Sequence, residues 1–218
     1  MKMLLLSTTR EDISKLKKPI ISRSDTMKNI LYYKLKEKLI KTGEHWEQYS
    51  PKEEHAIEYA HTFINPEPER KSKGMYSIPY LLASSGETIN ERFRYNHITA
   101  IDKQIAATVA LNHTKTDIVL YRGVSPIVWE LMKENAKQIP HCDLYEKGFL
   151  SCSLLKGHEI PSKIRLRIFV PAGTPAIYMG NINYEQKYYE VVINHGAELK
   201  IISIDDTYIN VELIKTTE

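Results

Sequence analysis

The spacing of apolar residues in the first half of the chain predicts helices. Apolar residues recur there every three or four positions, which is the period of an amphipathic helix. The predicted helices span residues 26–42, 51–63, 85–96 and 99–111. Ser50, followed by Pro51 and then by Glu53, has the residue types of a capping box and should start the second helix. In the last helix the expected buried stripe consists of Ile98, Ile101, Ile105 and Val109.

From residue 117 onward the apolar runs are shorter and richer in β-branched residues, which is typical of strands. The predicted strands span residues 117–121, 148–153, 164–170, 175–179, 188–193, 198–204 and 208–214. One more helix is expected after Ser125-Pro126, which carries the start signals of a helix. Because helices crowd the first half and strands the second, parallel βαβ units are not expected. The predicted class is α+β with a mainly antiparallel C-terminal half.

Glu190 is expected at the mouth of a strand. Val191 to Ile193 are β-branched, and Asn194 to Gly196 can turn the chain. The apolar run at 199–204 follows directly, so the two strands are expected to pair as a hairpin. A carboxylate at a strand entry is held on a rigid element and can still face a cleft.

The chain of 218 residues is long enough for one sizeable core and is interpreted as a single domain. Residues 1–45 are expected to form an N-terminal helical arm, irregular over 1–25. The segment 65–74 contains two prolines, many charges and no apolar residue, so a mobile loop is expected there. It is not interpreted as a domain boundary, because too little chain precedes it to bury a core.

The composition narrows the function classes. A hydrophobic content of 42% and a charged content of 26% are ordinary for a soluble globular protein. The formal charge of +3 does not favour nucleic-acid binding, and no apolar run has the length of a membrane span. Cys142 and Cys152 are too few for a disulfide framework, which leaves two reduced thiols or at most one bridge. The eight histidines lack ligand spacing, so no metal is expected.

Three fragments carry residues suited to chemistry: Leu120 to Gly123, Gly148 to Ser153, and Tyr188 to Glu190. Arg122 offers a planar fork that suits phosphate oxygens, and Gly123 lets a ligand approach the backbone. Ser151 and Ser153 can form hydrogen bonds inside a cleft, and Glu190 can stabilise a developing positive charge. Singly, each has an ordinary structural alternative: a surface arginine, hydroxyls on a strand face, or a solvated carboxylate.

Together and in this order, the fragments resemble the Arg–Ser–Glu class of ADP-ribosyltransferases. The pattern is most similar to that of bacterial exoenzyme toxins that modify actin or Rho-type GTPases. Tyr121-Arg122 takes the place of the aromatic–Arg pair, Ser151-Cys152-Ser153 that of Ser-Thr-Ser, and Tyr188-Tyr189-Glu190 that of Glu-x-Glu or Gln-x-Glu. Flanking fragments are also similar, namely Ile89 to Arg94, Val170 to Thr174 and Glu190 to Gly196. The likeness covers about residues 46 to 204.

The resemblance implies two packed, mainly antiparallel sheets with helices beside an NAD cleft. It implies that Arg122 holds the phosphates or ribose of NAD, assisted by Asn90 and Arg94, and that Ser151 orders the site around Glu190. Glu190 would bind the 2′-hydroxyl of the nicotinamide ribose and favour an oxocarbenium-like transition state. Residues 154–163 match the loop that covers phosphate and nicotinamide, where Lys163 or Arg165 is the candidate cation. The cofactor-binding set is therefore Arg122, Gly123, Asn90, Arg94, Ser151, Ser153, Lys163 and Arg165.

Tyr188 is the main departure from the family pattern. The family has Glu at this place when the acceptor is arginine, and Gln when it is asparagine, so the acceptor of this chain is open. Tyr184 and Glu185 join Tyr188 as candidates for acceptor recognition. Cys152 in place of the central Thr is a milder change.

Three hypotheses follow. The first is a mono-ADP-ribosyltransferase that acts on a protein, for which the resemblance suggests actin or a small GTPase, with a separate translocation component as a further partner. The second is an NAD glycohydrolase on the same fold, and the third is a non-enzymatic binding module. The resemblance implies secretion or delivery into a host cytosol; the short apolar run at Leu4 to Leu6 does not have the form of a signal peptide.

Overall fold

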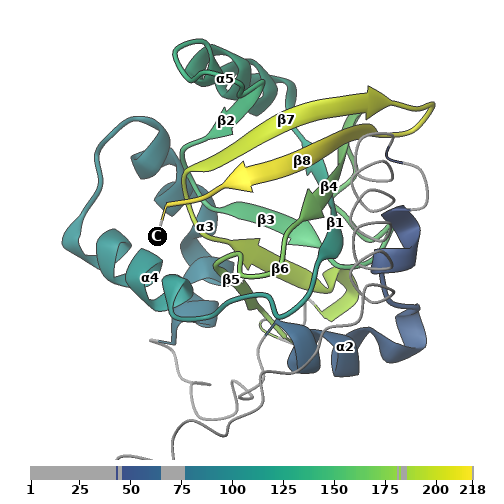
Figure 1. Cartoon of the computed structure of the whole chain (residues 1–218). Coiled ribbons are helices and arrows are strands. Elements are labelled where there is room, and N and C mark those ends of the chain that lie inside the picture. Colours follow the sequence, from purple (N-terminus) through teal and green to yellow (C-terminus); the bar gives the residue numbers. More distant parts are fainter. Residues whose placement is uncertain (1–42, 44–45, 65–76, 181, 183–185, 218) are drawn as a thin grey trace, which may run out of the picture. The chain divides into compact units, whose positions relative to one another are not determined.

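The computed structural model describes residues 43, 46–64, 77–180, 182 and 186–217, which belong to one compact unit (Figure 1). The helices, with short 3-10 helices written η, are η2 (Trp46–Tyr49), η3 (Glu53–His55), α2 (Ala56–Phe63), α3 (Ile78–Arg94), α4 (Ala100–Ala110), α5 (Pro126–Ala136) and η6 (Gln186–Tyr188). The strands are β1 (Ile118–Val124), β2 (Leu144–Glu146), β3 (Leu150–Ser153), β4 (Ile164–Val170), β5 (Ala176–Tyr178), β6 (Glu190–Ile193), β7 (Ala197–Ile204) and β8 (Ile209–Lys215). The predicted helix at 26–42, the arm at 1–45 apart from Gly43, and the loop at 65–74 lie outside the described residues.

The α+β class and the antiparallel character of the sheet are confirmed. Eight strands form one sheet in the order β2-β7-β8-β4-β1-β3-β6-β5, and among these described strands only β4 and β8 pair in parallel. The sequence predicted two packed sheets, whereas the strands of the structure form one continuous hydrogen-bonded sheet. The two halves nevertheless share one core, in which Leu199 of β7 and Val211 of β8 pack with Leu150 of β3 and Ile193 of β6. In the view of Figure 1, β7 and β8 lie above β3 and β6.

The predicted hairpin between the strands at 188–193 and 199–204 is wrong. Strand β6 pairs with β3 and β5, whereas β7 pairs with β2 and β8. The backbone N–H of Asn194 donates to the Pro175 carbonyl (2.9 Å), and its Nδ2 donates to the Thr217 carbonyl (3.0 Å). These bonds hold the connection between β6, in one half of the sheet, and β7, in the other half. Gly196 permits the change of direction because its φ is +75°.

Helix α4 confirms the predicted helix at 99–111 but not its buried stripe. Ile105 and Val109 are buried, whereas Ile98 and Ile101 are 39% and 61% exposed. The carboxylate of Asp102 is fully buried instead, because it completes the capping box and pairs with an arginine of α3. Because the buried carboxylate of Asp102 needs these partners, the side of α4 that carries Asp102 faces the protein interior, and Ile101 is exposed.

The predicted cap at Ser50 is also wrong. A 3-10 turn, η3, precedes α2, and α2 begins only at Ala56. The hydroxyl of Ser50 lies 3.1 Å from the hydroxyl of Tyr121 on β1 and donates to the Val119 carbonyl at 3.4 Å. A partner distant in sequence has replaced the local cap.

Helix α3 begins at Ile78, earlier than the predicted start at residue 85. The side chain of Ser77 accepts a hydrogen bond from the Tyr80 N–H, and Pro79 lies in the first turn, which together are a strong helix start. The buried face of α3 packs Ile89 and Phe93 against Phe149, just before β3. This packing fixes α3 beside the entry of β3.

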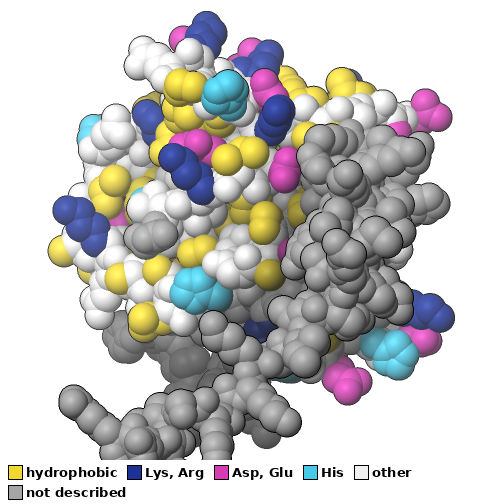
Figure 2. Space-filling model, viewed as in Figure 1, with side chains coloured by type: hydrophobic (Ala, Val, Ile, Leu, Met, Phe, Trp, Pro, Cys, Tyr) yellow, Lys and Arg dark blue, Asp and Glu magenta, His cyan; other side chains and the backbone are white. Residues whose placement is uncertain are grey.

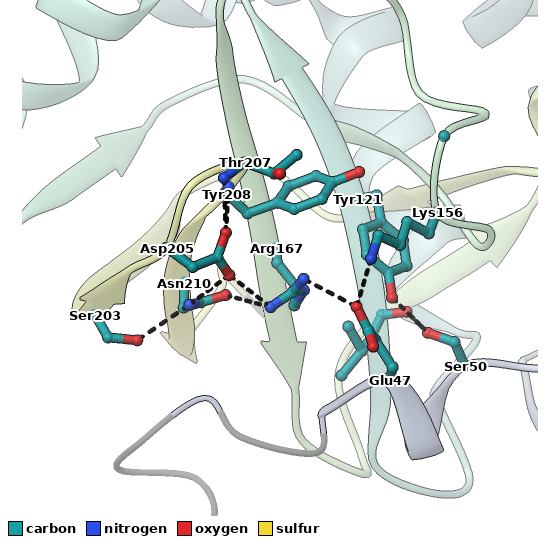
Figure 3. A network of polar contacts seen from close by, with 12 residues as sticks. Glu47, Ser50, Tyr121, Lys156, Arg167, Ser203, Asp205, Thr207, Tyr208 and Asn210 are labelled. Carbon is teal, nitrogen blue, oxygen red and sulfur yellow. Dashed lines mark hydrogen bonds and ion pairs between the residues drawn. The ribbon is translucent and has the colours of Figure 1, made fainter.

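A polar network joins η2 to β4 and to the turn before β8 (Figure 3). Arg167 donates from Nη2 to Glu47 (3.0 Å) and from Nη1 to Asp205 (2.9 Å) and Asn210 (3.1 Å). Its guanidinium also lies 4.9 Å from the centre of the Tyr208 ring. The segment at 46–50 is thereby fixed to the sheet.

Charges of both signs are interspersed among the described side chains on the face shown in Figure 2. Within the described part of the chain, no helix combines the length and apolar character that a membrane crossing requires.

Candidate functional site

The sheet brings the three sequence fragments together. Strands β1, β3 and β6 are neighbours, and Ser153 on β3 lies opposite Tyr121 on one side and Glu190 on the other. Residues opposite each other on antiparallel strands have Cα atoms about 4.5–5.5 Å apart. Fragments far apart in sequence therefore meet within one short stretch of sheet. The prediction that Glu190 lies at the mouth of a strand is confirmed.

A cleft of about 480 Å³ lies over this stretch. Helix α3 forms one wall with residues spaced by three and four positions, as one helix face requires. Tyr188 also lines the cleft, together with His158, Glu159 and Ile160 from the segment 154–163, which we name the cleft loop. The lining residues are Leu82, Ala83, Gly86, Glu87, Asn90, Arg94, Tyr121, Arg122, Gly123, Ser125, Val128, Ser151, Cys152, Ser153, His158, Glu159, Ile160, Tyr188 and Glu190.

Arg122 is held from two sides. Its Nη1 donates to the Ser151 carbonyl at 2.5 Å, and its Nη2 lies 3.8 Å from Oε2 of Glu146. Its Nε is buried and has no hydrogen-bond partner among the described residues. Arg122 lines the cleft, and its guanidinium is of a kind that suits an anionic ligand.

Glu146 was not identified from the sequence. Arg94 binds it through two parallel hydrogen bonds of 3.0 and 2.8 Å, and its Oε1 also accepts from the Gly148 N–H at 2.9 Å. The Glu146 side chain is only 1% exposed. Arg94 therefore lines the cleft while it is paired with a buried carboxylate. The sequence predicted no strand at Leu144 to Glu146, so the burial of this carboxylate in β2, and its need for a partner, became visible only in the structure.

Asn90 and Ser153 have side chains that are used by the fold. Oδ1 of Asn90 accepts from the Phe149 N–H at 2.7 Å, which ties α3 to the entry of β3. The hydroxyl of Ser153 donates to the Leu155 carbonyl (2.8 Å) and accepts from the Leu155 N–H (3.1 Å). Both residues line the cleft, but these bonds shape it.

Gly123 is required by the protein itself. A Cβ at Gly123 would lie 1.9 Å from the carbonyl oxygen of Ile160 in the cleft loop. The sequence suggested that Gly123 lets a ligand approach the backbone. In the structure, the backbone of the cleft loop makes this close approach instead.

Neither of the two candidate cations of the cleft loop region is itself a lining residue. Lys163 is exposed, and the lining residues include neither Lys163 nor Arg165. Arg165 donates from Nε to the Ser162 carbonyl (3.3 Å), and its Nη1 lies 3.9 Å from Oε1 of Glu159. Arg165 thus acts on the loop through Glu159.

Glu159 is a second carboxylate of the cleft that the sequence did not single out. Its Oε1 accepts from the Tyr208 hydroxyl at 2.8 Å, and its Oε2 accepts from the Gly157 N–H at 2.8 Å. Burial and then the bond to Glu159 raise the pKa of Tyr208, so the phenol remains a donor at neutral pH. The pair anchors the cleft loop to the turn before β8.

Tyr188 lies in η6 and lines the cleft in a half-buried position, so the predicted strand start at residue 188 is wrong. Tyr189 has a left-handed φ of +44°, which is incompatible with a strand, and β6 begins at Glu190. Nζ of Lys187 lies 4.9 Å from the centre of the Tyr188 ring. The other two candidates for acceptor recognition, Tyr184 and Glu185, are outside the described residues.

Both cysteines are free thiols. Burial raises the pKa of Cys152 to about 12, so this cleft-lining thiol stays protonated and is a poor nucleophile. Within the described ranges, no group of three or more His, Cys, Asp or Glu side chains could hold a metal ion.

Comparison with known proteins identifies the class. The family model for ADP-ribosyltransferase exoenzymes matches residues 71–217, which is more than half of the chain. The chain therefore belongs to the ADP-ribosyltransferase exoenzyme family, and the resemblance noted from its motifs is confirmed. Enzymes of this family use NAD as a substrate. A search of curated proteins by sequence found no match.

Solved structures of bacterial toxins share the fold. The Plx2a toxin of Paenibacillus larvae is 16% identical, with a TM-score of 0.55 over 74% of this chain and 96% of that one. C3stau2 of S. aureus, solved with NAD, is 19% identical, with a TM-score of 0.54 over 76% and 97% of the two chains. The C3 exoenzyme of Clostridium limosum is 16% identical, with a TM-score of 0.52 over 74% and 94%. At such identities the likeness is one of fold.

Proposed function

We propose that this protein is a mono-ADP-ribosyltransferase that cleaves NAD at its nicotinamide–ribose bond and transfers ADP-ribose to a protein. The observation that supports this most is the meeting of Arg122, Ser151 and Glu190 in one cleft, as the family pattern requires. The similar toxin C3stau2 was solved with NAD, which supports the same ligand here.

In this proposal Arg122 binds the phosphates or ribose of NAD. Its anchored Nη1 suits that role, because the guanidinium is oriented before the ligand arrives. Glu146, itself held by Arg94, supports the same guanidinium through Nη2. Asn90 and Ser153 shape the cleft, and Arg165 supports its loop through Glu159.

Glu190 acts on the bond that breaks. The electron pair of the C1′–N bond leaves with nicotinamide, and positive charge develops on the ribose. A fixed carboxylate beside the ribose stabilises that charge and accepts a hydrogen bond from the 2′-hydroxyl. The acceptor group then bonds to C1′ and loses its proton, which completes the transfer.

Tyr188 leaves open a second candidate, an NAD glycohydrolase in which water is the acceptor. Tyr188 replaces the carboxylate or amide that guides the acceptor in the family pattern, and its phenol ring lines the cleft. Tyr188 lacks the carboxylate that the family pattern has when the acceptor is arginine, so recognition of arginine by this residue is not expected. The resemblance suggests actin or a small GTPase as the acceptor protein. The proposal for a toxin also includes secretion of this protein and its delivery into a host cell by a separate component.

One experiment separates the candidates. The protein is incubated with NAD labelled on its adenylate moiety and with a eukaryotic cell lysate, and the products are separated by gel and by thin-layer chromatography. Label on a protein band supports the transferase, whereas free ADP-ribose alone supports the glycohydrolase. Intact NAD under all conditions would contradict both.

A further inference from the structure

Two segments that flank the cleft meet at one side chain, His158. The cleft loop carries His158, and residues 186–189, which we name the acceptor-side turn, carry Tyr188. Nδ1 of His158 lies 2.7 Å from the carbonyl oxygen of Lys187. His158 itself lines the cleft, so this joint between the segments lies at the edge of the site.

The bond to Lys187 determines which nitrogen of the ring carries the proton. A carbonyl oxygen can only accept, so Nδ1 must donate. This donation is possible in the neutral Nδ1–H form and in the imidazolium form. The joint between the two segments therefore does not depend on the charge of His158.

The ring is also held on its other sides. It meets the Tyr189 ring edge to face, with ring centres 5.3 Å apart and an angle of 81°. Its Nε2 lies 3.8 Å from Oε2 of Glu53, and Oε1 of Glu53 accepts from the Tyr189 hydroxyl at 3.3 Å. The Glu53 side chain is 64% exposed, so its charge is screened by water and contributes little. The bond from Nδ1 is the stronger link.

The acceptor-side turn needs such a link because its backbone is not part of the sheet. The ladder of β6 begins at Glu190, and the left-handed φ of Tyr189 separates Tyr188 from it. A left-handed conformation is costly for a residue with a side chain and persists where surrounding contacts impose it. The Tyr189 carbonyl accepts from the Leu154 N–H (3.0 Å) at the start of the cleft loop, and His158 supplies the second bond between the segments.

We propose that His158 is a positioning residue that fixes the acceptor-side turn, and with it Tyr188, against the cleft loop. This inference rests on the proposed function for its catalytic consequence: a fixed turn favours transfer of ADP-ribose to the protein acceptor over its loss to water. The role is separate from NAD binding, which the proposed function assigns to Arg122.

The test uses two substitutions at His158 in the whole chain. In His158→Asn the side-chain amide places an N–H near the position of Nδ1, so the bond to Lys187 can be kept. In His158→Leu the donor is lost. His97→Leu, at an exposed position after α3, is the matched control.

The first readout needs no activity: the rate at which trypsin cuts after Lys187, whose side chain is exposed. Loss of one hydrogen bond should raise the population of the open turn, and with it the cleavage rate, about 2- to 10-fold in His158→Leu. His158→Asn and His97→Leu should be cut like the wild type. An unchanged rate of cleavage by trypsin in His158→Leu would show that the bond from His158 to Lys187 does not hold the two segments together.

The second readout is the ratio of ADP-ribose transferred to protein to free ADP-ribose. It should fall in His158→Leu and recover in His158→Asn. Faster cleavage by trypsin with an unchanged ratio would overturn the effect on transfer. If the wild type itself leaves NAD intact, the proposed function fails and the positioning of the acceptor by His158 fails with it, while the trypsin result still decides whether the joint exists.

Discussion

At the scale of single residues, Glu190 is fixed by its register opposite Ser153 and by its place at the first position of β6. We expect Glu190→Gln to reduce NAD cleavage about 100-fold or more, because the loss of one preorganised electrostatic group typically costs that much. NAD affinity should stay within a few-fold, since the carboxylate acts mainly on the charge that develops in the transition state. Steady-state rates and calorimetry measure the two quantities. Near-normal turnover would refute the role of Glu190, and Glu91→Gln, on the exposed side of α3, is the control.

Arg122 should contribute to the binding of NAD, which precedes the cleavage step. Arg122→Lys keeps the charge but loses the planar fork that reaches the Ser151 carbonyl. We expect NAD affinity, measured by calorimetry, to weaken about 10-fold, which is the scale of one charge-assisted hydrogen bond. Arg92→Lys, on the same helix as Arg94 but paired with Asp102 outside the cleft, should bind NAD normally. Unchanged affinity in Arg122→Lys would make Arg122 a structural residue only.

Tyr188 should separate the two activities. If its ring contacts the acceptor, Tyr188→Ala reduces transfer to protein and spares hydrolysis of NAD, because Glu190 and Arg122 remain in place. Tyr188→Glu, which restores a carboxylate pair, should then favour arginine-like acceptors. The ratio of the two products measures the effect, with Tyr95→Ala, 57% exposed, as the control. Equal loss of both activities with a lower melting temperature would show that Tyr188 is needed only for the fold.

At the scale of elements, the cleft loop depends on the absence of a side chain on β1. A Cβ at Gly123 would lie 1.9 Å from the Ile160 carbonyl oxygen, which is backbone and cannot rotate away. Gly123→Ala should therefore destabilise the protein by about 1–3 kcal/mol, as overpacking does, and should speed cleavage by trypsin after Lys156, an exposed residue of the loop. Thermal unfolding and the rate of cleavage at Lys156 measure these effects.

Gly86 on α3 is the matched control for this substitution. A Cβ there meets nothing within 4 Å, and alanine is a better helix former than glycine. Gly86→Ala should raise the stability by about 0.5–1 kcal/mol. Destabilisation by both substitutions would argue against a specific clash at Gly123.

At the scale of the whole molecule, carboxylates that are paired with cations make the stability depend on pH in the acid range. The hydrogen bond from Arg92 lowers the pKa of Asp102 from 3.8 to about 2, against the opposing effect of burial. The bond from Lys156 likewise lowers the pKa of Glu47. A carboxylate with a lowered pKa contributes stability above its unfolded pKa, and this contribution is lost as the pH falls toward the folded value.

We therefore expect the melting temperature of the wild type to exceed that of Asp102→Asn by a margin that is full above about pH 5 and shrinks between about pH 4 and pH 2. The substituted asparagine cannot titrate, so the change in the margin reports the Asp102 carboxylate. Thermal melts over this pH range measure it. A margin that stays constant over the whole range would show that the ion pair between α3 and α4 does not carry this stability.

Sequence reasoning succeeded where the signal lies within a few residues. The period of β4 over 164–170 matches the observed strand, the helix at 99–111 was recognised, and Ser125 caps α5 as its position before Pro126 indicates. The order of the motifs around Arg122, Ser151 and Glu190 was enough for the family. Each of these depends on local backbone preferences or on residue order, which the chain carries in one dimension.

Tertiary structure decided everything that depends on partners far along the chain. Arg94 and Glu146 pair across 52 residues, so no local pattern showed that the arginine was already committed. Ser50 does not cap a helix, because its hydroxyl contacts the hydroxyl of Tyr121 instead. The strands on either side of Gly196 pair in different halves of the sheet. Buried polar groups must find partners wherever the fold places them. The sequence by itself determined the existence of helices α2, α3, α4 and α5, most strands and the three motifs. Strand order, register and the pairing of buried charges were decided only by the tertiary structure, because they depend on contacts between residues far apart in the sequence.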